Sequence, residues 1–234
     1  NKTIDTNTGV VTNITLETAS PEEVNNTVAV MGGEDWKFWV EALKEAGVTT
    51  DDFSTIAYSY IGPEVTTPIY REGTIGAAKE HLENTGLELN KILQQTGGSA
   101  YVSVNKALVT QSSSAIPVIP LYIGMLYKAM KSKGIHEGCI EQIERMFMEK
   151  VFNGTGSVVL DEIGRIRVDD WELRADVQEE VQSLWGEICT ENASQLSDQV
   201  GYQQDFLNLF GFGYDSVDYE AEYDPEVAII GLIE

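Results

Sequence analysis

Two short β-rich runs, separated by a long amphipathic segment, restrict the fold of this chain more than any other feature. Residues 55–60 end in two tyrosines before a Gly-Pro pair, and residues 100–110 are rich in valine. Between them, leucines recur on one stripe of the segment that ends near Leu93, which predicts a helix. Strands that pair in parallel need such a crossover helix. The succession therefore predicts an α/β fold with a parallel sheet.

The flanking segments suggest an arm on one side and helices on the other. Residues 1–31 alternate Thr, Val and Ile with turn residues, which indicates an irregular arm or a short hairpin. Residues 33–47 carry apolar side chains at helical spacing, so we expect a helix with Trp36 and Trp39 in the core.

The second half of the chain is predicted to be mainly helical. A polar loop at 111–115 leads into an apolar helix that ends near Gly134, and two further helices are expected at 136–151 and 170–188, before an acidic, solvated tail. We therefore expect three parts: an N-terminal arm (1–31), a catalytic α/β part (32–152) and a helical C-terminal region (153–234).

Charge and cysteine content exclude several classes of protein. Acidic residues outnumber basic residues by 38 to 15, for a formal charge of −23. Such a surface repels nucleic acid and anionic membranes, and no apolar run reaches the about 18 residues of a bilayer span. We expect neither a nucleic-acid nor a membrane partner. Cys139 and Cys189 lack a C-x-x-C partner, which favours free thiols and a cytoplasmic location.

The negative charge is unevenly distributed. No acidic residue occurs between Glu88 and Glu137, and residues 71–133 carry seven basic against four acidic side chains, or +3 beside −26 for the rest of the chain. Burial explains the missing carboxylates, but burial alone would remove lysines too. The interpretation we favour is a surface that faces an anionic ligand, such as a dinucleotide or coenzyme A.

Polar side chains gather where the two predicted strands end. Tyr58 and Tyr60 end the first run, and Thr110 ends the second, ahead of three serines. Ligands of open parallel sheets bind outside the carboxyl ends of the strands. A binding site between these residues is therefore predicted.

Tyr70 and Lys79 are the candidate catalytic pair. A phenol with an ordinary pKa near 10 donates a proton to a forming oxyanion at neutral pH. An ammonium group about 4 Å away favours the phenolate by up to about 4 kcal/mol at an effective dielectric of about 20, and it also donates to ribose hydroxyls or phosphate. The alternative is a half-buried tyrosine beside an unrelated surface lysine, and spacing alone favours that alternative.

The spacing of this pair demands a broken backbone. Nine positions on a regular helix amount to about 900°, which places two side chains on opposite faces. Pro68, Gly73 and Gly76 supply a possible break, with Thr74 as a candidate N-cap.

Two other groups of residues are weaker candidates for a functional site. His136, Glu137 and Cys139 lie too close together at a helix start to converge on a metal, so no metal site is expected. Residues 112–114 are serines without an acid-histidine pattern, which argues against a hydrolase triad.

Seven multi-residue segments, in order along nearly the whole chain, resemble the FabV-type trans-2-enoyl-CoA and enoyl-acyl-carrier-protein reductases. They are residues 30–36 (VMGGEDW), 57–62, 70–79, 114–122, 136–143, 169–173 and 210–212. The resemblance implies an incomplete Rossmann-like fold, related to the short-chain dehydrogenases, with an active tyrosine and lysine separated by eight residues.

The resemblance also implies roles for particular residues. Tyr70 is expected to hydrogen-bond the thioester carbonyl and donate a proton, Tyr60 to contact substrate, and Lys79 to bind the nicotinamide ribose. The expected strand-end contacts to NAD are Leu108, Val109 and Thr110. The implied reaction is reduction of enoyl-CoA or enoyl-acyl-carrier-protein by hydride from NADH in fatty acid biosynthesis.

One departure from the family is large. No G-x-G-x-x-G follows a strand in this chain, so the dinucleotide-binding N-terminal half of the family is expected to come from an upstream segment or a separate fragment. The isolated chain is then expected to be inactive. Descriptions of the family link its C-terminal region with flavin, but no physical flavin signature is present, so flavin is not expected. Two alternatives stay open: a non-catalytic acyl-CoA-binding fragment or subunit, and a ketoreductase of the same broad superfamily.

Overall fold

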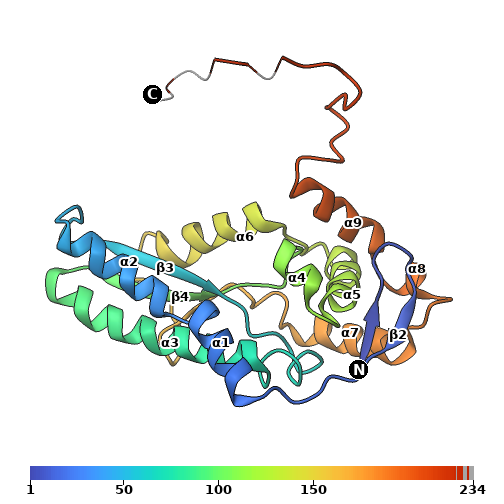
Figure 1. The fold of residues 1–234 in the computed structure, drawn as a ribbon, viewed down its shortest axis with the longest axis horizontal. Coiled ribbons are helices and arrows are strands. Elements are labelled where there is room, and N and C mark those ends of the chain that lie inside the picture. Colours follow the sequence, from blue (N-terminus) through green and yellow to red (C-terminus); the bar gives the residue numbers. More distant parts are fainter. Residues whose placement is uncertain (225, 229–230, 232–234) are drawn as a thin grey trace.

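A short parallel sheet forms the centre of the first half of the molecule (Figure 1). A computed structural model describes residues 1–224, 226–228 and 231. Strand β3 (Ser54–Ser59) pairs in parallel with β4 (Ser99–Val104), and helix α3 (Thr74–Leu93) connects them. The predicted strand, helix and strand are therefore confirmed, as is the α/β fold class. A 3-10 turn, η1 (Gln94–Thr96), follows α3.

The sheet continues on one side only. Strand β5 (Ile166–Arg167) pairs in parallel with β4, so the strand order is β3-β4-β5. Within the residues that the structure describes, β3 is an edge strand. No local pattern predicts β5, which has only two residues and depends on its pairing with β4.

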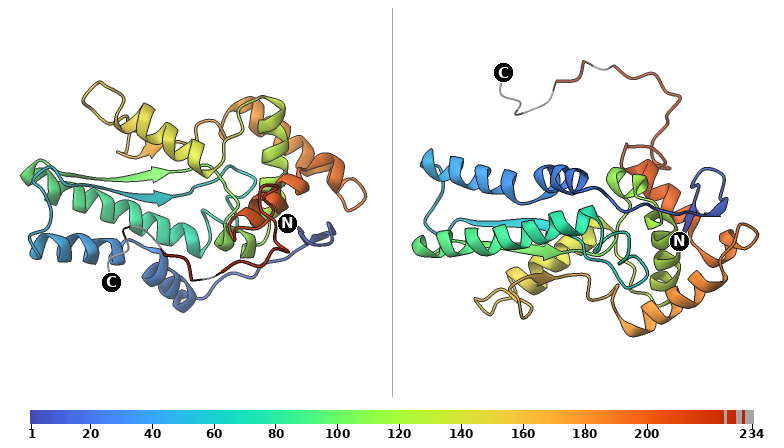
Figure 2. Two further views of the ribbon diagram at one scale, coloured as in Figure 1. Left: turned by 90° about the horizontal axis from the view of Figure 1, so that it is seen from above. Right: turned by 60° about the horizontal axis from the view of Figure 1, so that its bottom comes forward.

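Helices cover both faces of the sheet (Figure 2). Helix α2 (Glu34–Glu45) packs beside α3 on one face, where Trp36 donates from Nε1 to the Thr55 hydroxyl at 3.0 Å. On the other face lie α6 (Cys139–Arg145) and its π-helical continuation η2 (Met146–Val151). The expectation for Trp39 is wrong: it is 63% exposed, because it lies about 100° around the helix from the buried Val40.

The N-terminal region is more regular than expected. Strands β1 (Lys2–Ile4) and β2 (Val11–Asn13) form the expected hairpin, but α1 (Pro21–Met31) replaces the rest of the irregular arm. Ser20 accepts from the Glu23 backbone N–H, and the Glu23 carboxylate accepts from the Ser20 N–H. This capping box, with proline at the first helical position, fixes where α1 begins.

The second half of the molecule is built around α5 (Ile119–Ser132), whose side chains are buried almost throughout. It packs against β1 and two helices of the C-terminal region, α7 (Ala175–Glu187) and α9 (Gln199–Asn208). A short helix α8 (Ala193–Leu196) joins those two. The apolar helix and the helical C-terminal region are therefore confirmed. Residues 211–224 are exposed, as expected of a solvated tail.

Three expected boundaries need correction. The segment expected as a polar loop is a helix, α4 (Gln111–Ala115), because Thr110 and Ser113 cap it reciprocally. Strand β4 ends at Val104, six residues before the expected end. The two later helices begin at Cys139 and Ala175 rather than at 136 and 170.

Candidate active site

Tyr70 lies in a run of turns between β3 and α3. Its backbone N–H donates to the Thr66 carbonyl at 2.9 Å, and its own carbonyl accepts from the Gly73 N–H at 3.3 Å. The side chain is 7% exposed, and its ring packs edge to face on Tyr60 with 4.9 Å between centroids. Tyr70 therefore stands ahead of the helix, on the irregular backbone that convergence with Lys79 requires.

A close backbone approach joins the Tyr70 turn to the start of α3. A Cβ on Gly76 would lie 1.8 Å from the Arg71 carbonyl oxygen, so only glycine fits. Lys79 follows Gly76 by three positions, which puts both on neighbouring sites of one helix face. Lys79 is thus on the side of α3 that meets the Tyr70 turn. The N-cap of α3 is Gly73, and Thr74, expected there, is the first helical residue.

Burial governs the acid-base properties of the pair. It raises the pKa of Tyr70 to about 12, so the hydroxyl is protonated at neutral pH and available as a donor. Burial lowers the pKa of Lys79, while the nearby Glu83 carboxylate opposes that change. The expectation that Lys79 favours the Tyr70 phenolate is not met, because burial is the cause that acts on the Tyr70 pKa.

The Glu83 carboxylate is paired with two arginines. Its carboxylate accepts from Arg71 at 3.1 Å and lies 3.4 Å from the Arg165 guanidinium. Lys79, one helical turn earlier, makes no ion pair with any residue that the structure describes. Its ammonium group is therefore not committed to an ion pair within the described part of the chain.

The predicted strand-end residues lie beyond the observed end of β4. Val109 is 6% exposed and belongs to the same extended apolar cluster as Tyr70. Leu108 is half-buried, and its carbonyl accepts from the Ser113 hydroxyl at 3.0 Å. Thr110 is exposed, with its side chain and its N–H both engaged in the cap of α4.

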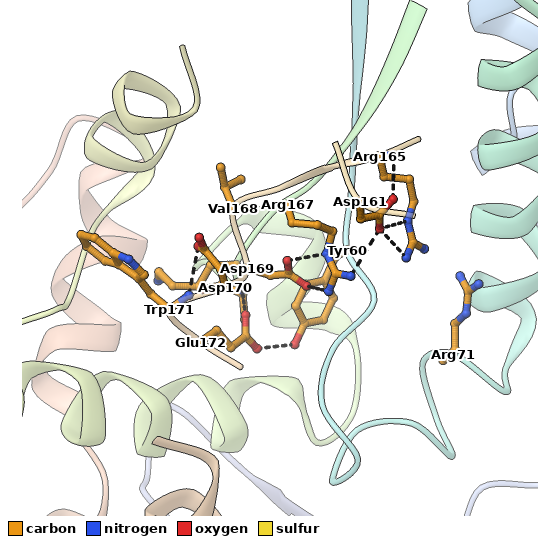
Figure 3. A network of polar contacts seen from close by, with 12 residues as sticks. Tyr60, Arg71, Asp161, Arg165, Arg167, Val168, Asp169, Asp170, Trp171 and Glu172 are labelled. Atoms are coloured by element: carbon orange, nitrogen blue, oxygen red, sulfur yellow. Dashed lines mark hydrogen bonds and ion pairs between the residues drawn. The ribbon is translucent and has the colours of Figure 1, made fainter. Parts of the chain in front are cut away.

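Tyr60 contacts a residue, Glu172, that was not among the predicted site residues. Its hydroxyl donates to the Glu172 carboxylate at 3.0 Å, as Figure 3 shows. Glu172 is fully buried and comes from the segment after β5. Its only sequence signal is a lone carboxylate between the apolar Trp171 and Leu173.

The positive charge of residues 71–133 is partly neutralised within the molecule. Lys131 pairs with Asp198 at 2.6 Å, and Lys133 pairs with Glu180 at 2.5 Å. Lys106 is 2% exposed, and burial lowers its pKa to about 8. Lys79, Lys91 and Lys128 form no ion pair with any residue that the structure describes, so part of the expected anion-facing surface remains.

A parallel sheet of order β3-β4-β5 with helices on both faces places the chain in the Rossmann-like α/β fold class. The family model for the trans-2-enoyl-CoA reductase catalytic region matches residues 1–152, and that for the enoyl reductase FAD binding domain matches residues 160–223. The chain belongs to the trans-2-enoyl-CoA reductase family.

Curated relatives match almost the whole chain. An NADH-dependent enoyl-[acyl-carrier-protein] reductase of Cytophaga hutchinsonii is 56% identical over 233 residues, which is 100% of this chain and 59% of the relative. The trans-2-enoyl-CoA reductase of Euglena gracilis is 54% identical over 97% of this chain and 41% of its own length.

Solved structures show the same fold. A Clostridium trans-2-enoyl-CoA reductase in complex with NADH has a TM-score of 0.91 and 50% identity, over 96% of this chain and 56% of its own. The Treponema denticola enzyme in complex with NAD has a TM-score of 0.89 and 51% identity, over 95% and 55%. The chain therefore spans less than two thirds of the length of these relatives.

The residues present fit one end of a nicotinamide dinucleotide. An available ammonium at Lys79 and a protonated phenol at Tyr70 suit a ribose and a reacting carbonyl. A diphosphate needs a Gly-rich loop at a helix N-terminus or clustered cations, and no G-x-G-x-x-G occurs in this sequence.

A flavin dinucleotide does not fit residues 160–223. This region holds no lysine, and its three arginines are each paired with a carboxylate. Sixteen acidic side chains surround them. A second diphosphate would meet repulsion there and no available cation.

Further findings concern metals, cysteines and membranes. Within residues 1–224, 226–228 and 231, no cluster of three potential ligands could hold a metal ion. Cys139 and Cys189 are free and exposed. No helix in the described part of the chain is both long and apolar enough to cross a bilayer.

Proposed function

We propose that this chain carries the substrate-reducing site of an NADH-dependent trans-2-enoyl thioester reductase. The substrates are enoyl-CoA or enoyl-acyl-carrier-protein, the products are acyl thioesters, and the setting is cytoplasmic fatty acid biosynthesis. The observation that carries the proposal is the buried, protonated Tyr70 on a broken backbone beside Tyr60 and the start of α3. The names of the relatives support the same reaction.

Each side chain has a role in this proposal. NADH, when bound, supplies hydride to the β-carbon of the enoyl thioester. Tyr70 donates a hydrogen bond to the thioester oxygen, where negative charge develops, and supplies the proton. Lys79 holds the nicotinamide ribose, and Tyr60 borders the substrate. The strand-end contacts to the dinucleotide come from Leu108, Val109 and Thr110.

We further propose that a dinucleotide-binding half, of the kind for which the relatives have room, completes the site. An unpaired strand edge is a template for pairing with another chain, and the edge of β3 that faces away from β4 is unpaired among the described residues. The dinucleotide diphosphate also needs donors that this chain lacks. The division into residues 1–31, 32–152 and 153–234 remains part of this proposal.

The test is NADH oxidation by three preparations: this chain alone, this chain with the N-terminal half of a relative, and a chain that carries both halves. With crotonyl-CoA we expect absorbance loss only where both halves are present. Oxidation with a 3-ketoacyl thioester instead would indicate a ketoreductase. Binding of acyl-CoA without oxidation in any preparation would contradict the proposal and indicate a non-catalytic acyl-CoA-binding subunit.

A further inference from the structure

A fully buried carboxylate lies among the apolar side chains around Tyr70. Glu172 is 0% exposed. Burying a charge without donors is costly, so such a group persists only where its surroundings satisfy it, and it often marks a functional site. Three donors satisfy this one: the Tyr60 hydroxyl at 3.0 Å and the Tyr122 hydroxyl at 2.5 Å, both to Oε1, and the Ala107 N–H at 2.7 Å to Oε2.

The backbone around Glu172 is firmly held. The Val168 N–H donates to the Val104 carbonyl at 3.0 Å, which extends the β5–β4 pairing. Arg145 donates to the Val168 carbonyl at 2.8 Å, and its guanidinium lies 4.2 Å from the Trp171 ring centre. Figure 3 shows Glu172 at the end of this segment, with its carboxylate pointing to the Tyr60 hydroxyl. The position of the carboxylate is therefore set by the fold.

All of its partners suit the ionised form. An ionised carboxylate only accepts hydrogen bonds, and each of the three neighbours is able to donate. Burial raises the pKa of Glu172, and the donated hydrogen bonds together with the nearby buried Lys106 oppose that rise. Gln178 fixes the backbone by donating to the Glu172 carbonyl at 2.6 Å.

The direction of one hydrogen bond has a chemical consequence. A tyrosine hydroxyl has a single proton, and Tyr60 uses it on Glu172. Tyr60 also packs edge to face on Tyr70, with 4.9 Å between ring centroids, and for any further partner its oxygen has only lone pairs left. We propose that Glu172 is a positioning residue that keeps Tyr60 a hydrogen-bond acceptor, so that Tyr70 alone donates to the substrate oxygen. This inference rests on the proposed reductase function.

A double-mutant cycle in the chain that carries both halves tests it. In Glu172→Gln the amide keeps the shape but offers N–H donors, which allows Tyr60 to turn its proton away. We expect kcat to fall about tenfold or more, while KM for NADH changes less than about twofold. In a Tyr60→Phe background, the same substitution should change kcat less than about twofold. An equal loss in both backgrounds indicates a purely structural role and overturns the proposal.

Matched variants sharpen the result. Tyr122→Phe removes the other hydroxyl from the same oxygen of Glu172, and we expect kcat to stay within about threefold of wild type. A loss as large as that of Glu172→Gln contradicts action through Tyr60. If Glu172→Gln does not fold, Glu172→Asp keeps the charge but retracts it by one methylene, and its effect should also depend on Tyr60.

A measurement without turnover separates this inference from the proposed function. With a carbon-13 label at tyrosine Cζ, the Tyr60 resonance is identified by its loss in Tyr60→Phe. We expect it to shift in Glu172→Gln, because the hydroxyl loses its ionised acceptor. An unmoved resonance overturns the Glu172–Tyr60 coupling. A protein that carries both halves, shows the coupling and yet reduces no enoyl thioester refutes the proposed function instead.

Discussion

Gly76 lies so close to Arg71 that a single added methyl group would overlap the Arg71 carbonyl oxygen, 1.8 Å away. This contact joins the turn that carries Tyr70 to the first turn of α3, one turn before Lys79. The geometry of the candidate pair therefore depends on a glycine that contributes no functional group.

Gly76→Ala should be destabilising and should impair catalysis. The new Cβ meets backbone, which has no flexible end to move, so we expect a loss of about 3 kcal/mol in the free energy of unfolding. Urea denaturation measures it. The matched control is Gly186→Ala in α7, where nothing lies within 4 Å and alanine should stabilise the helix by about 0.5–1 kcal/mol. Equal effects of the two substitutions would contradict the close approach.

Tyr70→Phe should lower kcat by about 10² to 10⁴ because it removes the donor hydroxyl. Stability should change by less than about 0.5 kcal/mol, since burial, and no hydrogen bond, dominates the environment of that hydroxyl. Steady-state kinetics and thermal unfolding check the two statements. Tyr223→Phe, at a side chain that is 69% exposed near the C-terminal end of the chain, should leave kcat unchanged. Wild-type turnover in Tyr70→Phe would remove the role assigned to Tyr70.

Lys79→Met should weaken NADH binding about tenfold or more, the usual loss when a charged hydrogen bond is removed. Fluorescence titration with NADH measures the Kd. Lys91→Met, near the end of the same helix and exposed, is the control and should leave the Kd unchanged. Similar affinities for all three proteins would place the ribose elsewhere.

Acid should destabilise the protein through His136. Burial, with Lys106 and Lys131 nearby, lowers the pKa of His136 to about 4. The unfolded chain, with a histidine pKa near 6.5, therefore binds more protons between about pH 6.5 and 4, so stability falls as pH falls through that window. Between about pH 7.5 and pH 5 the contribution is about 2 kcal/mol.

His136→Gln removes this contribution. Urea denaturation at both pH values should show a stability difference between variant and wild type that moves in favour of the variant by about 2 kcal/mol on acidification. Parallel pH profiles for the two proteins would contradict a pKa shift at His136.

Local periodicity predicted the parts of the fold that depend on local pattern. The strand, helix and strand around α3 and the apolar helix α5 lie within a few residues of their expected positions. Helix α1 was missed although Ser20, Pro21 and Glu23 form a complete start signal. The Thr- and Asn-rich residues around it favoured the prediction of an irregular arm instead.

Features that depend on contacts between residues far apart in the sequence could not be predicted from local pattern. Strand β5 exists because β4 has a free edge, and the importance of Glu172 depends on Tyr60 and Tyr122, which lie 112 and 50 residues away. Spacing showed that Tyr70 and Lys79 need a broken backbone. It did not show that burial, rather than the lysine, would control the Tyr70 pKa.

The hydrogen bond between Tyr60 and Glu172 crosses from one matched family region to the other. Chimeras that join residues 1–152 of one relative to residues 160–223 of another should therefore work only when the tyrosine and the glutamate are inherited together. Exchanging these two regions between relatives, a common strategy for altering substrate range, therefore requires a matched Tyr60–Glu172 pair. Neither region shows this requirement on its own.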